Sequence, residues 1–429
     1  MPSFAVRNFG CRANQAEAFS WADDLRERGL RLEEDWGRSD LVVVNSCTLT
    51  GRADRDVKKF IRMVGRENPG TRIVVTGCLA ERAPGEMAAM PGVVAVLPQS
   101  AKDRLAERVT ALEGLASPPG LDGSAGRSGV AAEDREASFR ARAYLKIQDG
   151  CDDRCAYCII PSVRGRSRSV PPDDLAASVR GLAARGFREI VLAGIHLSSY
   201  GEDLEPRRSL LGLLRELGAV AGRSRLRLSS LDPRLTDDEL VAHVAADGRI
   251  CPHFHLSLQH ASGRVLRSMG RPVEAGSHER LLDTLRRLSP DAALGADVMV
   301  GFPGETPDDY DELRGFIDRS PLTSVHVFSY SARQGTPAAS RPRVAEGIIT
   351  ERAKALRRLS ALKDFAFRRR FHARELEAVV IDRSGPAAEV LTGNFIKVAI
   401  PRCGASEGDL VRVSISRVLP RRTEGEVIA

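Results

Sequence analysis

Residues 151–158 read CDDRCAYC, so that Cys151, Cys155 and Cys158 follow the spacing C-x3-C-x2-C within one short stretch. Three thiolates on such a loop can hold three corners of a four-iron cube. Clusters of this type held by a protein normally use four thiolates. The missing fourth ligand therefore indicates a coordination position that is open to another molecule.

Two other uses of these three thiols agree less well with the sequence. A structural zinc site takes four ligands, usually in paired elements, and no second pair or suitable histidine cluster lies near residues 151–158. A disulfide accompanied by one free thiol is typical of a small secreted domain. We therefore favour an iron–sulfur cluster with one open iron.

The composition is that of an ordinary globular protein. The 429 residues are 42% hydrophobic and 28% charged, and a chain of this length is expected to form about two to four domains. The N-terminus lacks the apolar core of a signal peptide, and no stretch reaches membrane-spanning length. We therefore expect a cytoplasmic protein, whose eight cysteines serve as metal or cluster ligands rather than disulfides. The net charge of +7 allows a polyanionic partner but is weak evidence for one.

Residues 1–110 alternate short apolar runs with helical patterns. The runs at 4–6, 41–44 and 73–75 have the composition of buried strands, and helical stretches such as 53–65 lie between them. This alternation predicts an α/β domain with a parallel sheet and helices on both faces.

Each of these predicted strands leads directly into a cysteine. Cys11, Cys47 and Cys78 come at similar offsets after the strands, and Gly10 and Gly77 directly precede two of them. Parallel strands bring their carboxyl ends to the same edge of a sheet, so the thiols are expected to converge. The glycines would allow tight turns or close backbone approach. One such cysteine would be interpreted as an ordinary buried thiol, but three at matching offsets favour a second cluster site with one open iron.

A change in composition follows this domain. Residues 111–138 are rich in Gly, Pro, Ser and Ala, which predicts a flexible linker. Six βα units are then expected over residues 139–370, with candidate strands at 143–148, 189–195, 226–231, 254–259, 295–301 and 325–330. Six units are too few for a closed eight-stranded barrel and predict an open, partial barrel. Chemistry in such folds lies at the carboxyl ends of the strands, where residues 151–158 follow the first one.

The C-terminal part predicts a different architecture. Residues 351–370 have helical periodicity and hold eight Lys or Arg against two acids, which fits either a solvated helix face or a footprint for a nucleic-acid backbone. Residues 371–429 contain strand-like runs at 376–381, 395–400 and 410–415 and predict a small antiparallel β-barrel. This barrel has a net charge of zero. Cys251 and Cys403 have no partners by spacing and are interpreted as structural.

The spacing of the first cysteine triad is the signature of the radical S-adenosylmethionine enzymes. Combined with the second triad, an N-terminal α/β domain and a small C-terminal barrel, it resembles the methylthiotransferase family over almost the whole chain outside the linker. The barrel resembles the TRAM module, an RNA-binding fold. Further similarity lies in GCRANQ at 10–15, AGIH at 193–196, HLSLQ at 255–259, DVMVGFPGET at 297–306 and HVFSY at 326–330.

Three branches of that family differ in substrate: isopentenyl-type adenosine 37 of tRNA, threonylcarbamoyl adenosine 37 of tRNA, and an aspartate of a ribosomal protein. The stretches GCRAN at 10–14, CIIP at 158–161, CPHFHLSLQ at 251–259 and QGTPAA at 334–339 are most similar to the threonylcarbamoyladenosine branch. We therefore expect a tRNA methylthiotransferase that modifies C2 of this adenosine.

Some positions depart from the family pattern. His260-Ala261 stands where the family often has Ser-Gly, Ser162 replaces a common aromatic residue, and Val170 replaces an arginine after an Arg-rich loop that Arg164-Gly165 matches. These departures concern the substrate rather than the cluster chemistry.

The resemblance implies that a [4Fe–4S] cluster on Cys151, Cys155 and Cys158 passes an electron to bound S-adenosylmethionine, which then yields a 5′-deoxyadenosyl radical. The protein's part in such chemistry is to position the cofactor and exclude water. The residues expected near S-adenosylmethionine are Tyr157, Gly194 and Gln259, for each of which simple packing or turn formation is an open alternative.

The resemblance further implies a second [4Fe–4S] cluster on Cys11, Cys47 and Cys78 that carries the sulfur, which a second S-adenosylmethionine methylates. The expected partners are the anticodon loop of tRNA, an electron donor and a sulfur source, the last two of unknown identity. Two rivals remain: another radical enzyme with an auxiliary cluster, acting on a protein or small molecule, and a non-enzymatic metal-bound RNA-binding protein. The sequence leaves the oligomeric state open.

Overall fold

The computed structural model describes residues 1–112 and 141–428, which form two compact units. The first contains 1–112 with 150–152 and 158–166, and the second contains the other described residues. The linker expected at 111–138 lies outside the described residues from 113 onward. No helix in the described ranges is long and apolar enough to cross a membrane.

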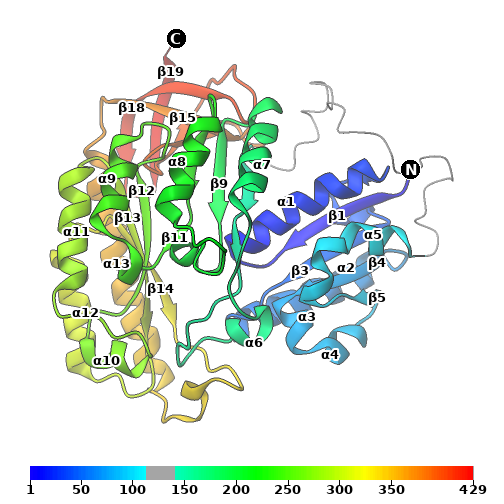
Figure 1. Cartoon of the computed structure of the whole chain (residues 1–429), viewed down its shortest axis with the longest axis horizontal. Helices are drawn as coiled ribbons and strands as arrows, with labels where there is room; N and C mark the ends of the chain where they lie inside the picture. The colour runs from blue at the N-terminus through cyan, green and yellow to red at the C-terminus, as the bar shows by residue number, and fades with distance from the viewer. Residues whose placement is uncertain (113–140, 429) are drawn as a thin grey trace. The chain divides into compact units, whose positions relative to one another are not determined.

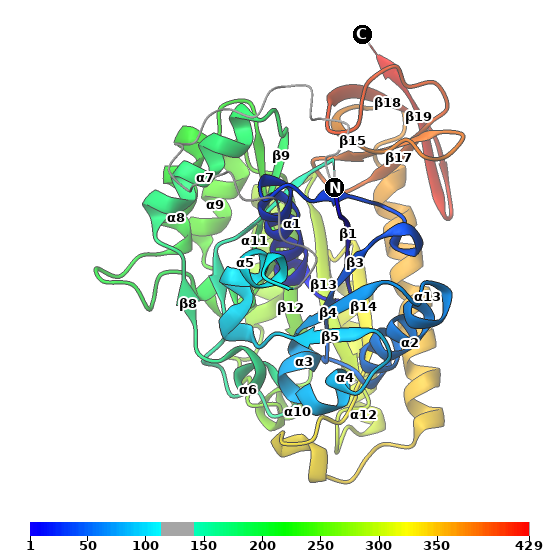
Figure 2. The ribbon, with the colours of Figure 1, turned by 90° about the vertical axis from the view of Figure 1, so that its right-hand side faces the viewer.

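The first unit is built on a parallel sheet of order β2-β1-β3-β4-β5. Val42, Val43 and Val44 of the central strand are completely buried because helices cover both faces. Figure 2 shows the larger strands side by side. The bounds are β1 Ser3–Asn8, β2 Arg31–Leu32, β3 Leu41–Ser46, β4 Arg72–Gly77 and β5 Val93–Val96.

Alternation along β3 explains the two-sided core of this unit. Val43 packs on one face with Trp21 and Leu25, whereas Val42 and Val44 pack on the other with helix residues that include Ile61. The α/β prediction for this part is therefore confirmed. Its helices are α1 Arg12–Glu27, α2 Gly51–Glu67, α3 Cys78–Arg82, α4 Pro84–Ala88 and α5 Leu105–Thr110, with α6 Ile160–Arg164 also in this unit.

The second unit contains the open, partial barrel that the six βα units predict. Its strands form two parallel sheets, of order β10-β9-β6 and β11-β12-β13-β14, and Leu226 of β10 forms an isolated parallel bridge with Ile250, which precedes β12. The bounds are β6 Ala143–Lys146, β9 Glu189–Ala193, β10 Arg225–Leu228, β11 Ser230–Leu231, β12 His253–Gln259, β13 Ala293–Val300 and β14 Ser324–Ser329. A short ribbon pairs β7 Gln148–Asp149 with β8 Arg168–Ser169.

Amphipathic helices accompany these strands, and α13 packs along β14 (Figures 1 and 2). Helix α12 begins with a capping box in which Thr306 and Asp309 satisfy each other's backbone amides. The helices are α7 Pro172–Ala184, α8 Leu210–Val220, α9 Asp238–Ala246, α10 Gly263–Ser268, α11 Ser277–Leu288, α12 Pro307–Arg319 and α13 Glu346–Arg369.

The C-terminal strands close into a barrel of order β15-β16-β17-β19-β18, which confirms the predicted small barrel. Its pairings are antiparallel except for a short parallel contact between β17 and β19. The bounds are β15 Glu375–Asp382, β16 Ala388–Thr392, β17 Lys397–Ile400, β18 Leu410–Leu419 and β19 Arg422–Ile428.

Two buried arginines of β10 attach this barrel to the partial barrel through hydrogen bonds. Arg225 Nη2 donates to Leu391 O at 2.8 Å, and Arg227 donates to Thr392 O at 3.0 Å and to Gly393 O at 2.9 Å. All these acceptors are main-chain carbonyl oxygens of the barrel.

Candidate iron–sulfur sites

Three neighbouring strands of the first unit deliver one cysteine each. Cys11 directly precedes α1, Cys47 directly follows β3, and Cys78 is the first residue of α3 after β4. The thiols are near enough to affect one another electrostatically. The pKa of Cys47 is raised to about 12, mainly by burial and also by the neighbouring Cys11 and Cys78. Burial likewise raises the pKa of Cys11, which Arg164 opposes. The three cysteines therefore follow adjacent parallel strands at the same edge of the sheet, which is where the sequence places them.

Glycines shape two of these cysteine positions in different ways. Gly77 has φ +94°, and a Cβ there would lie 2.3 Å from Ser46 O, so only glycine fits before Cys78. Gly10 has no positive φ, but a Cβ there would lie 2.3 Å from the Asn14 side chain. The first glycine permits a turn and the second permits a close approach.

A buried polar network adjoins the same thiols within the first unit. Glu17 accepts from Lys102 Nζ at 2.6 Å and from Arg164 Nη1 at 2.9 Å. Arg164 also donates from Nη2 to Asn14 Oδ1 at 2.6 Å and from Nε to Cys78 Sγ at 3.4 Å. Sequence reasoning missed this network, although the Arg164-Gly165 pair was a signal for it.

The loop with the C-x3-C-x2-C spacing runs from β7 to α6. Gly150 precedes Cys151 with φ +71°, and a Cβ there would meet Arg166 O at 1.9 Å, so the loop begins with an obligatory glycine. Cys151 N donates to Gly165 O at 3.1 Å. Cys151 and Cys158 belong to the first unit, and the buried Cys155 belongs to the second.

The second-unit part of the loop is anchored by backbone and side-chain contacts. Ala156 N donates to Met269 O at 2.8 Å, and Ala338 N donates to Ala156 O at 2.8 Å. Arg271 Nη1 lies 3.7 Å from Cys155 Sγ, so a guanidinium group faces this thiol. A cationic group is therefore directed at one of the three sulfurs of this loop.

The residues expected near S-adenosylmethionine all lie in the second unit. Tyr157 packs edge-on against Phe302, with ring centroids 6.5 Å apart. Gly194 follows β9, and a Cβ there would lie 3.2 Å from Gln148 Oε1. Gln259 ends β12 with φ +66°, an uncommon backbone conformation for a side-chain-bearing residue.

A charged cluster that sequence reasoning missed surrounds Asp232 in the second unit. His196 Nε2 lies 3.1 Å from Asp232 Oδ2, and Arg271 Nη2 donates to the same oxygen at 2.8 Å. Arg234 donates to both Asp232 and Asp153. Burial alone would raise the pKa of Asp232, but these donors hold it far below its usual range. Asp153, which lies in the loop of the C-x3-C-x2-C motif, connects this group of charged residues to that loop.

Another group of titratable side chains lies across β12, β13 and β14. His255 Nε2 lies 2.9 Å from Asp297 Oδ1, and His326 Nδ1 lies 3.6 Å from the same oxygen. Burial would raise the pKa of Asp297, yet hydrogen bonds from the two histidines lower it to about 2. The stretches that contain these residues were recognised in the sequence, but their meeting was not.

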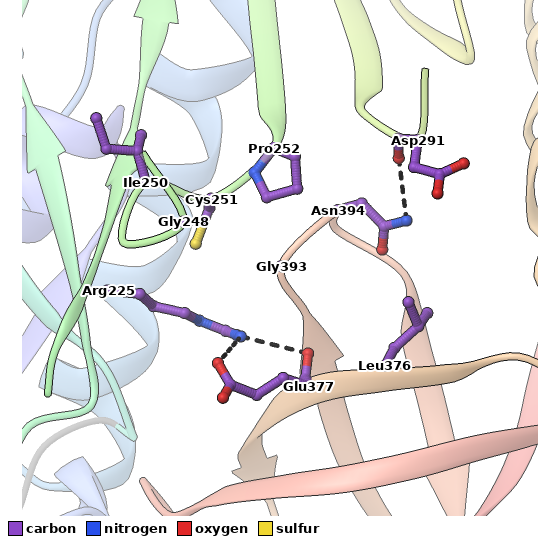
Figure 3. Close-up of a pocket in the computed structure, with 10 residues that line it drawn as sticks. All are labelled: Arg225, Gly248, Ile250, Cys251, Pro252, Asp291, Leu376, Glu377, Gly393 and Asn394. Atoms are coloured by element: carbon purple, nitrogen blue, oxygen red, sulfur yellow. Dashed lines mark hydrogen bonds and ion pairs between the residues drawn. The ribbon is translucent and has the colours of Figure 1, made fainter. Parts of the chain in front are cut away.

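A pocket opens near the start of β10 and β12, the opposite strand ends from those near the cysteine loop (Figure 3). Arg225 and Glu377 form an ion pair on one side, and Asn394 donates to Asp291 O at 3.1 Å on the other. Cys251 also lines it, but no expected cluster or cofactor residue does. The pocket therefore belongs to the attachment of the C-terminal barrel.

The basic segment 351–370 forms most of α13, but its cations have different roles. Arg352 is buried against Glu305, and the buried Arg368 donates to Leu419 O at 2.9 Å and Pro420 O at 2.8 Å. These two arginines are structural. The exposed cations of the segment are Lys354, Arg357, Arg358, Arg369 and Arg370.

Comparisons with known proteins match both units. Residues 3–98 match the model described as "Uncharacterized protein family UPF0004", and residues 145–317 match the Radical SAM superfamily. The fold is similar to TsrM, a radical S-adenosylmethionine methyltransferase from Kitasatospora setae, with a TM-score of 0.56 and 16% identity over 79% of this chain and 77% of that one.

Two kinds of curated relative cover nearly the whole chain. Threonylcarbamoyladenosine tRNA methylthiotransferase MtaB is 34% identical in Aquifex aeolicus, over 96% of this chain and 99% of the relative. The enzyme of that name from Bacillus subtilis is 31% identical, over 100% and 97%. The tRNA-2-methylthio-N(6)-dimethylallyladenosine synthase of Cereibacter sphaeroides is 32% identical, over 98% and 97%.

Proposed function

Since the chain belongs to the radical SAM methylthiotransferase family, we propose that it adds a methylthio group at C2 of N6-threonylcarbamoyladenosine 37 in the anticodon loop of tRNA. The convergence of Cys11, Cys47 and Cys78 in a chain that also carries the C-x3-C-x2-C loop supports this function most directly. One triad alone would account for radical formation but would leave no site for sulfur.

The family defines the reaction class and the cofactors. The protein is a transferase that acts on tRNA and uses S-adenosylmethionine with two [4Fe–4S] clusters. When bound, these groups supply an electron for cleavage of S-adenosylmethionine and a place for the transferred sulfur. The donor sets fit, because each is a cysteine triad with a guanidinium group at one of its sulfurs.

We assign the first cluster to Cys151, Cys155 and Cys158 and the second to Cys11, Cys47 and Cys78. In the first, Arg271 would donate a hydrogen bond to the Cys155 sulfur. We place S-adenosylmethionine near three residues that follow or end strands of the second unit, where α/β folds bind ligands. These are Tyr157, Gly194 and Gln259.

The modified nucleoside is proposed from the sequence stretches most similar to the threonylcarbamoyladenosine branch. The names of the relatives do not separate the branches, because a dimethylallyladenosine synthase is also 32% identical. That nucleoside is therefore the second candidate substrate. Exposed cations of α13 would contact the tRNA backbone. Because tRNA is the substrate, we propose that the protein acts in the cytoplasm. The reaction also requires an electron donor and a sulfur source.

Mass spectrometry of tRNA nucleosides tests the substrate, using cells with and without the gene. Loss of the methylthio form of threonylcarbamoyladenosine, restored by the wild-type chain but not by Cys155→Ala, is the expected result. Loss of the methylthio dimethylallyl form instead would favour the second candidate. Unchanged tRNA would overturn both and would direct attention to a ribosomal-protein aspartate.

A further inference from the structure

Two buried cations share the carboxylate of Glu17 in the first unit. Lys102 is 3% exposed, Arg164 is completely buried, and Glu17 is 2% exposed. Glu17 can neutralise one of the two positive charges. Burial of a further charge is costly unless an opposite charge compensates it. The groups that lie next to the remaining positive charge therefore indicate where a compensating negative charge would bind.

That charge lies at the cysteine edge, the edge of the parallel sheet that carries Cys11, Cys47 and Cys78. Arg164 Nε donates to Cys78 Sγ at 3.4 Å, and its charge also acts on Cys11 and Cys47. Burial lowers the pKa of Lys102, and the negative charges of Glu17 and Cys78 oppose this effect and favour the charged ammonium. A cube in its oxidised form carries two positive charges and three thiolates carry three negative ones, so the bound assembly would be an anion. It would compensate the excess charge of the network.

We propose that Arg164 is a positioning residue for the cluster on Cys11, Cys47 and Cys78, to which it donates a hydrogen bond at Cys78 Sγ, and that together with Lys102 it raises the reduction potential of that cluster. This inference rests on the proposed assignment of the cluster to these cysteines. Hydrogen bonds to the sulfurs and nearby positive charge both favour the reduced, more negative state of a cluster.

The same arginine connects the two cysteine motifs along the chain. Arg164 ends α6, which begins two residues after Cys158, and it is held by Asn14 and Glu17 of α1. The segment that carries the C-x3-C-x2-C motif therefore also carries Arg164, which donates to a cysteine ligand of the other cluster. A merely structural ion pair would stabilise α6 but would leave the potential of the cluster unchanged.

The test uses the full chain with Cys151, Cys155 and Cys158 replaced by Ala, so that the spectrum reports the other cluster alone. After anaerobic reconstitution, a redox titration followed by electron paramagnetic resonance measures the midpoint potential. Arg164→Met should lower it enough to change the ratio of reduced to oxidised cluster about tenfold, which corresponds to about 59 mV for one electron. Arg164→Lys, which keeps the charge, should lie between parent and Arg164→Met.

Two further variants keep the test decisive. Lys102→Met removes charge without touching a sulfur and should lower the potential by less, so the inference can be tested even where Arg164→Met fails to fold. Arg104→Met removes an exposed charge of the same unit and should have no effect.

Unchanged potentials in Arg164→Met and Lys102→Met, with the cluster bound, would overturn this inference and leave the cluster assignment intact. A parent that binds no iron would overturn the assignment and the inference together.

Discussion

Arg227 is fully buried in the second unit, and its Nε lies 2.8 Å from Glu189 Oε1. Glu189 also accepts from Arg225 Nε at 2.8 Å and from Arg142 Nη1 at 3.1 Å. Burial alone would raise the pKa of Glu189, but the guanidinium groups hold it well below its usual range. One carboxylate therefore orients both arginines that reach the carbonyl oxygens of the C-terminal barrel.

Glu189→Gln should destabilise the protein strongly. The substitution removes the anion that the buried Arg227 contacts, and breaking a buried ion pair costs about 3–5 kcal/mol. Denaturant unfolding of the full chain measures the loss. Glu239→Gln, which breaks the exposed pair with Arg215, should cost less than about 1 kcal/mol. Equal effects of the two changes would contradict the central role of Glu189.

Gly77→Ala should remove one cluster selectively. The new Cβ would lie 2.3 Å from Ser46 O at a positive φ, so the turn that presents Cys78 must change. Iron analysis after anaerobic reconstitution should fall from about eight to about four irons per chain. Gly85→Ala, at a position with open space around it, should keep the full complement. Full iron content in Gly77→Ala would show that this turn does not form the site.

Substitutions in the two cysteine triads should abolish different reactions. Cys155→Ala should abolish reductive cleavage of S-adenosylmethionine, whereas Cys47→Ala should retain cleavage but yield no methylthio product. Assays of 5′-deoxyadenosine and of the modified nucleoside distinguish these outcomes. Cys403→Ala, in the C-terminal barrel, should retain both reactions. A methylthio product from the Cys47 variant would refute the division of roles.

Stability should fall in mild acid because of His278. Burial lowers the pKa of this histidine to about 4, and its Nε2 has no hydrogen-bond partner among the described residues. In the unfolded chain the pKa of a histidine is about 6.5, so the unfolded state takes up the proton at a higher pH than the folded state. The free energy of unfolding therefore has its full value above about pH 6.5 and decreases by up to about 3 kcal/mol as the pH falls towards 4. His278→Leu should abolish this dependence in urea unfolding, and the exposed His372→Gln should not. An unchanged pH profile in His278→Leu would exclude this residue as the cause.

Charge reversal on α13 should weaken tRNA binding. Lys354 and Arg358 are exposed, and their substitution by Glu should lower affinity for any tRNA and reduce the salt dependence of binding by about one unit per lost phosphate contact. Binding titrations at several salt concentrations measure both effects. Arg215→Glu, an exposed change on α8, should leave binding unaffected. Equal loss in both variants would indicate a general charge effect instead of a binding face.

The cysteine edge could be predicted because its geometry is local. Each of Cys11, Cys47 and Cys78 follows a strong apolar strand, and parallel pairing then brings the strand ends together. The short edge strands β2 and β5 and the barrel strands β16 and β19 were not predicted from the sequence. Two of them are only two and four residues long, too short for a clear pattern.

The charged networks could not be predicted, because their members are distant in the chain. Arg164 and Glu17 are 147 residues apart, and Glu189 and Arg227 are 38 apart. A buried arginine and an exposed one have the same appearance in a sequence. The segment 351–370 illustrates this: its periodicity predicted the helix, but only the structure separates the buried Arg352 and Arg368 from the exposed cations.

Arg225 and Arg227 bind the C-terminal barrel through Leu391 O, Thr392 O and Gly393 O. Every amino acid has a carbonyl oxygen, so these three hydrogen bonds place no demand on the side chains at positions 391–393. Exposed side chains of the barrel can therefore be substituted without breaking these three bonds. The surface of the C-terminal barrel can in this way change during evolution while its attachment to the partial barrel stays constant.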